Sequence, residues 1–441
     1  VLLLTLALIL VCGWSKPAQD RVLNVPYMGN FTDFELYSGY LEIPGKQRKL
    51  HYIFAESQHS PKSDPLVLWF NGGPGCSSML GFAQEHGPYS MPDGEDKFYK
   101  NPNSWNLEAN MLYIESPAGV GYSYFWGKDI DHFNDTTSSE DNYAALVAFF
   151  QKFPEYQAHD LFISGESYAG IYVPYLAWQI IEHGSQFNLK GIIVGNGVTN
   201  YTYDCNPAYI NMGFWHNLYG TELRDKMIKL GCKFTNLETE SKECEELERQ
   251  FDRLVSKVNV YDVYRHCYYE NETDRMGSAV INGELQTYKR GMTAQEYTPF
   301  LFKNKKDNIT PPCVYGKGTT DFFNKQEVRD AFHVETKQPW EMCTSRIHYS
   351  TGEKASYWIY PILKKNNIRA LHFSGNADGA VPTQGTREWI NSLGWKTTRP
   401  YAPFYIENKQ VGGFVEEYEG ITFTSIQGIG HMAAQWSPVA T

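Results

Sequence analysis

Apolar runs, each followed by glycine-rich or small polar residues, recur along the chain. Such runs are typical of buried strands, and we predict strands at Leu66–Phe70, Asn110–Glu115, Leu161–Ser164, Leu189–Val194, Ile368–Phe373 and Ile421–Gln427. Between some of them the apolar residues recur with the period of a helix, which predicts helices at Glu140–Phe150 and Ile171–Glu182. Strands that alternate with helices predict an α/β fold with a mainly parallel sheet.

The pattern changes between about Thr202 and Arg346. Polar and charged residues dominate there, and six of the eight cysteines lie in this stretch. Two further helices are predicted, at Thr221–Leu230 and Glu243–Lys257. We therefore predict a discontinuous core, formed by residues 19–202 and 347–441, with an inserted cap at residues 203–346.

The first residues, Val1 to Val11, are almost all apolar, and small or polar residues follow. The run is too short for a membrane span and resembles the apolar region of a signal peptide. Because no initiator Met or charged segment precedes it, we predict that the sequence begins inside a signal peptide that covers residues 1–18. A buried N-terminal strand or helix is the alternative. No later run of about 18 apolar residues predicts a membrane span.

Composition narrows the class of protein. Of the 441 residues, 42% are hydrophobic and 20% are charged, as in ordinary globular proteins. The net charge is −11 and there is no long basic run, so nucleic acids and anionic membranes are not expected partners.

Cysteines and glycosylation sequons favour an oxidising compartment. Without Cys12, which the signal peptide would remove, seven cysteines remain, so most would pair and one would be left over. No C-x-x-C pair and no paired His/Cys spacing suggests zinc, so no metal site is predicted. The N-x-[S/T] sequons are at Asn30, Asn134, Asn200, Asn271 and Asn308, and Pro311 makes the last a poor acceptor.

The strongest candidate for chemistry is Ser167 in the sequence GESYAG, residues 165–170. It lies between a predicted strand and a predicted helix, which is the context of a nucleophile elbow. Small neighbours allow the tight turn that projects the hydroxyl, although Ala169 replaces the usual final glycine. The alternative is an ordinary serine in a strand–helix turn.

A nucleophilic serine needs a base and an acid that orients it. Asp378 and His431 follow the two last predicted strands in glycine-rich turns, in the order Ser, Asp, His that this type of turn requires. His372 lies inside a predicted strand and is expected to pack in the core.

The loop NGGPGCSS, residues 71–78, is a candidate oxyanion hole. Consecutive glycines let backbone N–H groups approach a developing negative charge. Phosphate binding is the competing use of such a loop, but no lysine follows it and the G-x-G-x-x-G spacing is absent.

These motifs together resemble the serine carboxypeptidase family. The resemblance is carried by WFNGGPGCSS (69–78), ESPAGVGYSY (115–124), GESYAG, the Asp378 turn and GHM (430–432), and it runs from about Phe34 to the C-terminus. Within the family, YSGYL (37–41), EHGP (85–88), FPEY (153–156) and GESYAGIYVP (165–174) are most similar to the lysosomal, cathepsin A-type members.

The resemblance implies an α/β-hydrolase fold and a serine carboxypeptidase that acts through an acyl-enzyme without a cofactor or metal. It implies a catalytic triad, two oxyanion-hole residues, and a group that binds the free carboxylate of a peptide substrate. By position, the triad is Ser167, Asp378 and His431. The oxyanion-hole residues are Gly73 and Tyr168, and the carboxylate-binding group is Asn71, Glu85 and Glu166.

The two glutamates predict an acidic pH optimum. They cannot both be ionised beside a substrate carboxylate, so a proton must be shared among the three groups. The alternatives are an acyltransferase on the same scaffold, against which the carboxylate-binding group argues, and a non-catalytic protein that protects lysosomal glycosidases. A homodimer and such glycosidases are further partners that the resemblance leaves open, in the lysosome or outside the cell.

By resemblance, the disulfides are Cys76–Cys343, Cys232–Cys244 and Cys267–Cys313, which leaves Cys205 unpaired. The chain departs from the family at Ala433-Ala434, where Val-Pro is usual, and at Asn376, where many relatives have Asp. It stops at Thr441, where a final helix is expected, which predicts a fragment of lower stability.

Overall fold

A computed structural model describes residues 16–127, 132–184, 187–235, 240–267, 276–281, 284–289, 313, 316–352 and 354–441. The predicted signal peptide lies almost wholly outside the described residues, and so do the sequons at Asn271 and Asn308.

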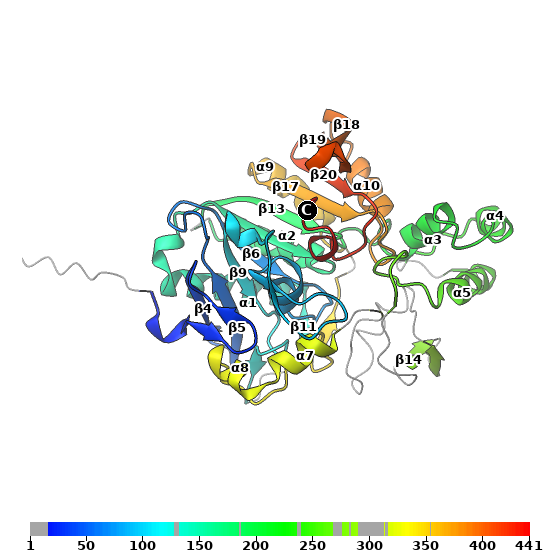
Figure 1. The fold of residues 1–441 in the computed structure, drawn as a ribbon. Helices are drawn as coiled ribbons and strands as arrows, with labels where there is room; N and C mark the ends of the chain where they lie inside the picture. Colours follow the sequence, from blue (N-terminus) through cyan, green and yellow to red (C-terminus); the bar gives the residue numbers. More distant parts are fainter. Residues whose placement is uncertain are drawn as a thin grey trace, which may run out of the picture.

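One 12-stranded sheet organises the molecule (Figure 1). Six neighbouring strands at its centre, β9, β6, β12, β13, β17 and β20, are parallel to one another. Antiparallel strands extend both edges of this parallel part. All six strands predicted from the sequence are present and lie in this parallel part. In spatial order the strands are β1 (Arg21–Val22), β4 (Leu36–Glu42), β5 (Arg48–Ala55), β9 (Asn110–Ile114), β6 (Leu66–Phe70), β12 (Leu161–Glu166), β13 (Leu189–Gly195), β17 (Arg369–Gly375), β20 (Ile421–Ile426), β19 (Val411–Tyr418) and β18 (Thr397–Tyr405), and β10 (Tyr124–Phe125) pairs with β5.

Strand β6 is apolar throughout because both of its faces are buried. In β6, Leu66, Leu68 and Phe70 join one hydrophobic cluster, whereas Val67 and Trp69 join a second cluster across the sheet. Side chains of a strand alternate between its two faces, so a strand that lies between two cores needs apolar residues at every position.

Helices α1 and α2 cover the first face. α1 (Asp135–Lys152) packs against α2 (Ala169–Glu182), which packs against β12 and β13. The side chain of Asn134 accepts a hydrogen bond from the Thr137 backbone N–H and caps the first turn of α1. Both helices begin slightly before their predicted starts. The other helices of the final part of the chain are α9 (Tyr360–Lys365), α10 (Thr383–Ser392) and α11 (Ala433–Trp436).

The segment between β13 and β17 forms two separate parts of the structure. Its first helices, α3 (Asn206–Trp215), α4 (Thr221–Leu230) and α5 (Lys242–Val255), extend away from the sheet (Figure 1). In contrast, α7 (Lys317–Phe323) and α8 (Gln326–Ala331) lie near β5, and Phe323 shares the second cluster with Trp69. The cap boundaries at residues 203 and 346 remain a prediction, since α7 and α8 pack with residues of the predicted core.

Short strand pairs complete the described structure. The parallel pair of β11 (His132–Asn134) and β16 (His348–Ser350) joins the segment that precedes α1 to the segment that follows α8. The pairs are β2 (Asn24–Val25) with β3 (Gly29–Asn30), β7 (Tyr89–Ser90) with β8 (Tyr99–Lys100), β11 (His132–Asn134) with β16 (His348–Ser350), and β14 (Met276–Ile281) with β15 (Glu284–Lys289).

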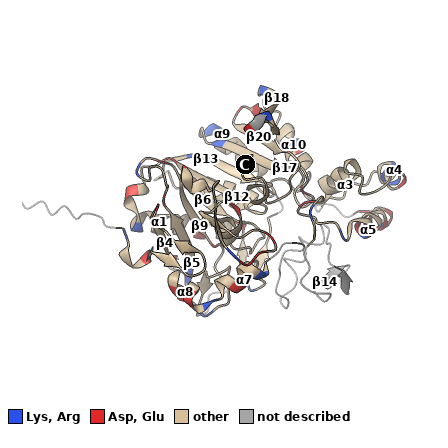
Figure 2. Cartoon of the chain, in the orientation of Figure 1, with Lys and Arg blue, Asp and Glu red and all other residues tan. Residues whose placement is uncertain are grey.

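Three disulfides join Cys76 to Cys343, Cys232 to Cys244 and Cys267 to Cys313, which are the pairings that the resemblance implies. Cys205 is buried and unpaired. In the described part of the chain, no helix has the length and apolar character needed to cross a bilayer. Figure 2 shows acidic and basic residues interspersed along the outer helices, such as α5 and α8.

Candidate active site

The candidate residues gather at one edge of the sheet. Parallel strands place their carboxyl ends at the same edge, where ligands usually bind in α/β folds. The residues that follow these ends are Asn71 after β6, Ser167 after β12, Asn196 after β13, Asp378 after β17 and His431 after β20.

Ser167 occupies a strained turn between β12 and α2. Its φ angle is 64°, in the left-handed region that non-glycine residues rarely adopt. Crowding explains the glycine before it, because a Cβ on Gly165 would lie 2.5 Å from the Phe70 carbonyl oxygen. Two backbone hydrogen bonds hold the turn: Ser167 N donates to Gly195 O (3.1 Å), and Val198 N donates to Ser167 O (2.9 Å).

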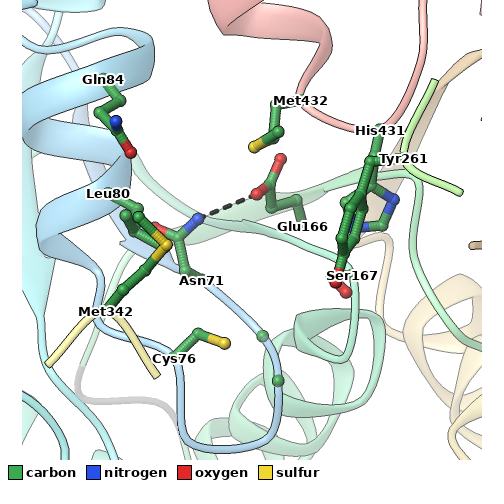
Figure 3. Close-up of a pocket in the computed structure, with 12 residues that line it drawn as sticks. Asn71, Cys76, Leu80, Gln84, Glu166, Ser167, Tyr261, Met342, His431 and Met432 are labelled. Atoms are coloured by element: carbon green, nitrogen blue, oxygen red, sulfur yellow. Dashed lines mark hydrogen bonds between the residues drawn. The ribbon is translucent and has the colours of Figure 1, made fainter. Parts of the chain in front are cut away.

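Asp378 and His431 form a buried pair. His431 Nδ1 lies 2.7 Å from Asp378 Oδ2, and the two side chains are 3% and 0% exposed. The Ala380 backbone N–H donates to the other carboxylate oxygen at 2.7 Å. The His431 ring and Ser167 line the same pocket, on one side of it (Figure 3). A carboxylate that orients an imidazole beside a serine is the arrangement that nucleophilic catalysis requires.

The glycine-rich loop lies directly against the nucleophile turn. A Cβ on Gly72 would lie 2.3 Å from the Tyr168 backbone nitrogen, so only glycine allows this approach. Gly73 has a φ angle of 110° and lines the pocket beside Ser167. The Tyr168 hydroxyl donates to Asp135 Oδ1 at 2.8 Å, which anchors that side chain on α1. Gly73 and Tyr168 thus flank Ser167, as two oxyanion-hole residues must.

Asn71, Glu85 and Glu166 form a second polar group, of which Asn71 and Glu166 line the same pocket. The Asn71 Nδ2 group donates to one oxygen of each glutamate, at 2.9 Å in both cases. Its Oδ1 accepts from Trp69 Nε1 (2.8 Å) and from the Gly81 backbone N–H (3.0 Å). These donors fix the amide so that its nitrogen faces the glutamates. Figure 3 shows Asn71 and Glu166 across the pocket from Tyr261.

The two glutamates hold protons at pH values where ordinary glutamates are ionised. Burial raises the pKa of Glu85 to about 7. Burial, and then the neighbouring Glu85 carboxyl, raise the pKa of Glu166 well above its usual value. A protonated carboxyl can donate a hydrogen bond, so this group can bind an anion such as a carboxylate.

Other residues of the site were not predicted from the sequence. Tyr261 comes from the segment between β13 and β17, and its ring centroid lies 5.1 Å from that of His431. Asn196 directly follows the end of β13 and hydrogen-bonds to Asp378. Because functional residues usually follow the carboxyl ends of parallel strands, the sequence could have identified this residue. Three further lining residues, Leu80, Gln84 and Met342, carry no motif, whereas Met432 belongs to the GHM sequence.

The other predicted residues lie elsewhere. Asn30 and Asn134 are exposed, whereas Asn200 is buried and its side-chain oxygen accepts from the Thr202 backbone N–H, which does not favour glycosylation there. His372 is buried in β17 and contacts the Tyr360 hydroxyl, as expected for a core residue. Among the described residues one group of three could approach a metal, Cys232, Glu240 and Cys244, but its two cysteines are bonded to each other.

Comparison with known proteins agrees with this geometry. A family model described as serine carboxypeptidase matches residues 26–441. The lysosomal protective protein of Mus musculus is 35% identical, over 99% of this chain and 95% of that protein. Serine carboxypeptidase 1 of Hordeum vulgare is 31% identical, over 96% of this chain and 91% of that protein.

A solved structure shows the same fold. It is Kex1(delta)p, a prohormone-processing carboxypeptidase from Saccharomyces cerevisiae, with a TM-score of 0.72 and 19% identity over 96% of this chain and 94% of that one. The predicted α/β-hydrolase fold with its mainly parallel sheet is thereby confirmed. The family match and the identity over almost the whole chain show that this protein belongs to the serine carboxypeptidase family.

Proposed function

We propose that this protein removes single residues from the C-termini of peptides through an acyl-enzyme formed on Ser167. The observation that carries the proposal is that Asn71 and Glu166 line the pocket together with Ser167 and His431, and that Asn71 hydrogen-bonds to both Glu166 and Glu85. A nucleophile beside a carboxylate-binding group fits a substrate whose scissile bond adjoins its free carboxyl end.

The reaction follows from the roles of these groups. The Asn71 amide and a protonated glutamate bind the substrate carboxylate. His431 takes the Ser167 proton as the hydroxyl oxygen attacks the last peptide carbonyl, and the N–H groups of Gly73 and Tyr168 stabilise the oxyanion. His431 then protonates the leaving amine, and water, deprotonated by His431, releases the shortened peptide from Ser167.

An acidic pH optimum follows from the same group. Glu85 and Glu166 bind a carboxylate only while they retain a proton, and loss of that proton places like charges together. We therefore expect peptide binding to weaken as the pH rises through the pKa of Glu85, about 7.

The test is mass spectrometry of a peptide pool before and after incubation with the enzyme. A ladder of C-terminal losses from free-acid peptides at acidic pH, absent with Ser167→Ala, supports the proposal. Internal cleavage, or ladders that start at the N-terminus, would refute it.

An acyltransferase is the alternative enzyme, in which an alcohol replaces water in the second step. Its substrates need no free carboxylate, so the paired glutamates count against it. Adding alcohols to the peptide assay distinguishes the two, because a transferase would give esters in preference to free acids.

The protein's partners and location are also proposals. Three disulfides and two exposed sequons support the secretory pathway, with the lysosome or the cell exterior as the destination. The murine relative is named a protective protein, so glycosidase binding is tested by co-purification with Ser167→Ala. A homodimer is tested by sedimentation.

A further inference from the structure

Asn196 lies where two parts of the active site meet. It follows β13, and its side chain is 1% exposed. The neighbouring residues of its loop hold the nucleophile turn, because Gly195 O and Val198 N hydrogen-bond to the Ser167 backbone. Its own side chain reaches the next strand, where Asp378 follows β17.

Both polar atoms of the Asn196 side chain are used. Nδ2 donates to Asp378 Oδ2 at 2.8 Å, and Oδ1 accepts from the Gly375 backbone N–H at 3.0 Å. Nδ2 also makes longer contacts with Ser374 Oγ (3.3 Å) and Gly375 O (3.4 Å). Of the described residues, only Asn196 and His431 contact the Asp378 carboxylate through side chains, since its other donors are the backbone N–H groups of Ala380 and Val381.

We propose, on the basis of the proposed function, that Asn196 is a positioning residue for the triad. It holds Asp378 Oδ2 in the orientation that receives His431 Nδ1, and it stabilises the ionised carboxylate that a protonated His431 needs. Because the same loop holds the Ser167 backbone, Asn196 also fixes the acid relative to the nucleophile. Its effect reaches the substrate only through Asp378 and His431, so it should affect turnover rather than binding.

Asparagine suits this position for two reasons. Its φ angle is 39°, a left-handed conformation that Asn and Asp tolerate better than most residues. It also combines a donor for Asp378 with an acceptor for Gly375, which no carboxylate can do. Asn196→Asp is therefore a matched variant: the backbone and the acceptor for Gly375 remain, and only the donor toward Asp378 is lost.

Charged and titratable groups surround the introduced carboxyl. Asp378 contacts the Asn196 side chain directly, and His431 contacts the same oxygen of Asp378. Other elements contribute Glu166, Asp262, Cys205 and Tyr209, each of which interacts electrostatically with Asp378. Two carboxyls this close cannot both ionise easily, so the new one holds a proton at acidic pH and can then donate to Asp378. At higher pH the proton is lost and the two groups repel.

The experiment compares Asn196→Ala and Asn196→Asp with the parent enzyme, using a free-acid peptide and a blocked ester over a range of pH. We expect kcat to fall about 10- to 100-fold in Asn196→Ala, the usual effect of losing a hydrogen bond to a charged group, with KM little changed for both substrates. Asn196→Asp should approach the parent kcat as the pH falls and lose activity as it rises. Ser374→Ala is the control, since Ser374 contacts Asn196 but not Asp378.

Three results decide the outcome. Equal kcat for parent and Asn196→Asp at every pH would overturn the inference. So would a loss that is the same at every pH, or that appears equally in Ser374→Ala, because a merely structural role predicts that pattern. If Asn196→Ala fails to fold, the Asp variant decides alone, with its thermal unfolding measured beside the parent. A parent enzyme that cleaves no peptide C-terminus would instead refute the proposed function.

Discussion

At the scale of single residues, burial changes what a glutamate can do. Glu85 and Glu166 would be ordinary acceptors in water, but the low dielectric of the pocket and their mutual proximity keep protons on them. In the proposed function, this protonated pair binds the carboxylate of the substrate. The sequence could predict this much, since the types of residue and the conflict of charge are visible there, but not the pKa of Glu85 or the hydrogen bonds through Asn71.

The first prediction concerns pH. For a free-acid peptide, kcat/KM should fall as the pH rises through about 7, the pKa of Glu85, because the proton that binds the substrate carboxylate is lost. The ester or amide of the same peptide presents no carboxylate and should retain its kcat/KM at neutral pH. Glu166→Gln should raise KM for the free acid more than for the ester. Superimposable pH profiles for the two substrates would contradict this mechanism.

The second prediction concerns the nucleophile. Ser167→Ala should lower kcat on the order of 10⁶-fold, as in other enzymes whose serine is removed. A fluorophosphonate should label the parent enzyme at Ser167, which peptide mapping would locate, and chelators should have no effect. Label on a different serine, with activity lost, would show that the nucleophile lies elsewhere.

At the scale of elements, the turns that carry Asp378 and His431 are hydrogen-bonded to a segment that lies between α5 and β14. The Gly379 N–H donates to Val260 O (2.8 Å), the His431 N–H donates to Tyr261 O (2.7 Å), and the Val263 N–H donates to Ala377 O (3.0 Å). Residues from the predicted insertion therefore form part of the frame of the site. Hydrophobic pattern could not predict this, because these contacts are made by backbone groups of residues far apart in sequence.

The third prediction tests the aromatic part of this segment. Tyr261→Ala removes the ring that lies against His431 and should lower kcat/KM about three- to tenfold, the range expected for loss of an aromatic contact. Tyr261→Phe keeps the ring and is the matched control, with activity near that of the parent. Equal losses in the two variants would assign the effect to the hydroxyl instead of the ring.

The elements themselves differed in how well they could be predicted. The central strands were found because burial on both faces makes them rich in apolar residues, continuously so in β6. β18 and β19 were missed because exposed residues dominate β18 and mixed burial blurs the pattern of β19. The start of α1 was missed because its first turn is polar and is capped by Asn134, a residue that the sequence presented as a glycosylation site.

At the scale of the whole molecule, one disulfide joins distant parts of the chain at the active site. Cys76 and Cys343 are separated by 267 positions. The Ser77 and Thr344 N–H groups reinforce the junction by donating to Met342 O and Gly75 O, at 2.8 and 2.9 Å. The glycine-rich loop at residues 71–78 is therefore supported by a segment that follows α8, and the sequence alone left this pairing among the 15 that six cysteines allow.

The fourth prediction compares two disulfides. Replacing Cys76 and Cys343 by serine should lower the free energy of unfolding by about 2–5 kcal/mol and should also lower kcat/KM, because Gly73 is no longer held. Replacing Cys232 and Cys244, which join α4 to α5 away from the pocket, should lower stability with little effect on kcat/KM. Denaturant unfolding and peptide hydrolysis measure both. Similar activity in the two double variants would show that the Cys76–Cys343 disulfide does not support the loop.

The fixed orientation of the Asn71 amide also bears on which terminus of a peptide binds beside it. Trp69 and Gly81 occupy its oxygen, so the group cannot turn over to present an acceptor to an ammonium ion. Under the proposed function, we expect a peptide to bind with its carboxyl terminus at this amide, and the distance between that anchor and Ser167 to set the length of each step. Every cycle creates a new carboxyl terminus of the same chemistry, so the product of one turnover is a substrate for the next. Such an enzyme shortens a chain residue by residue until it meets a side chain that the pocket cannot accommodate.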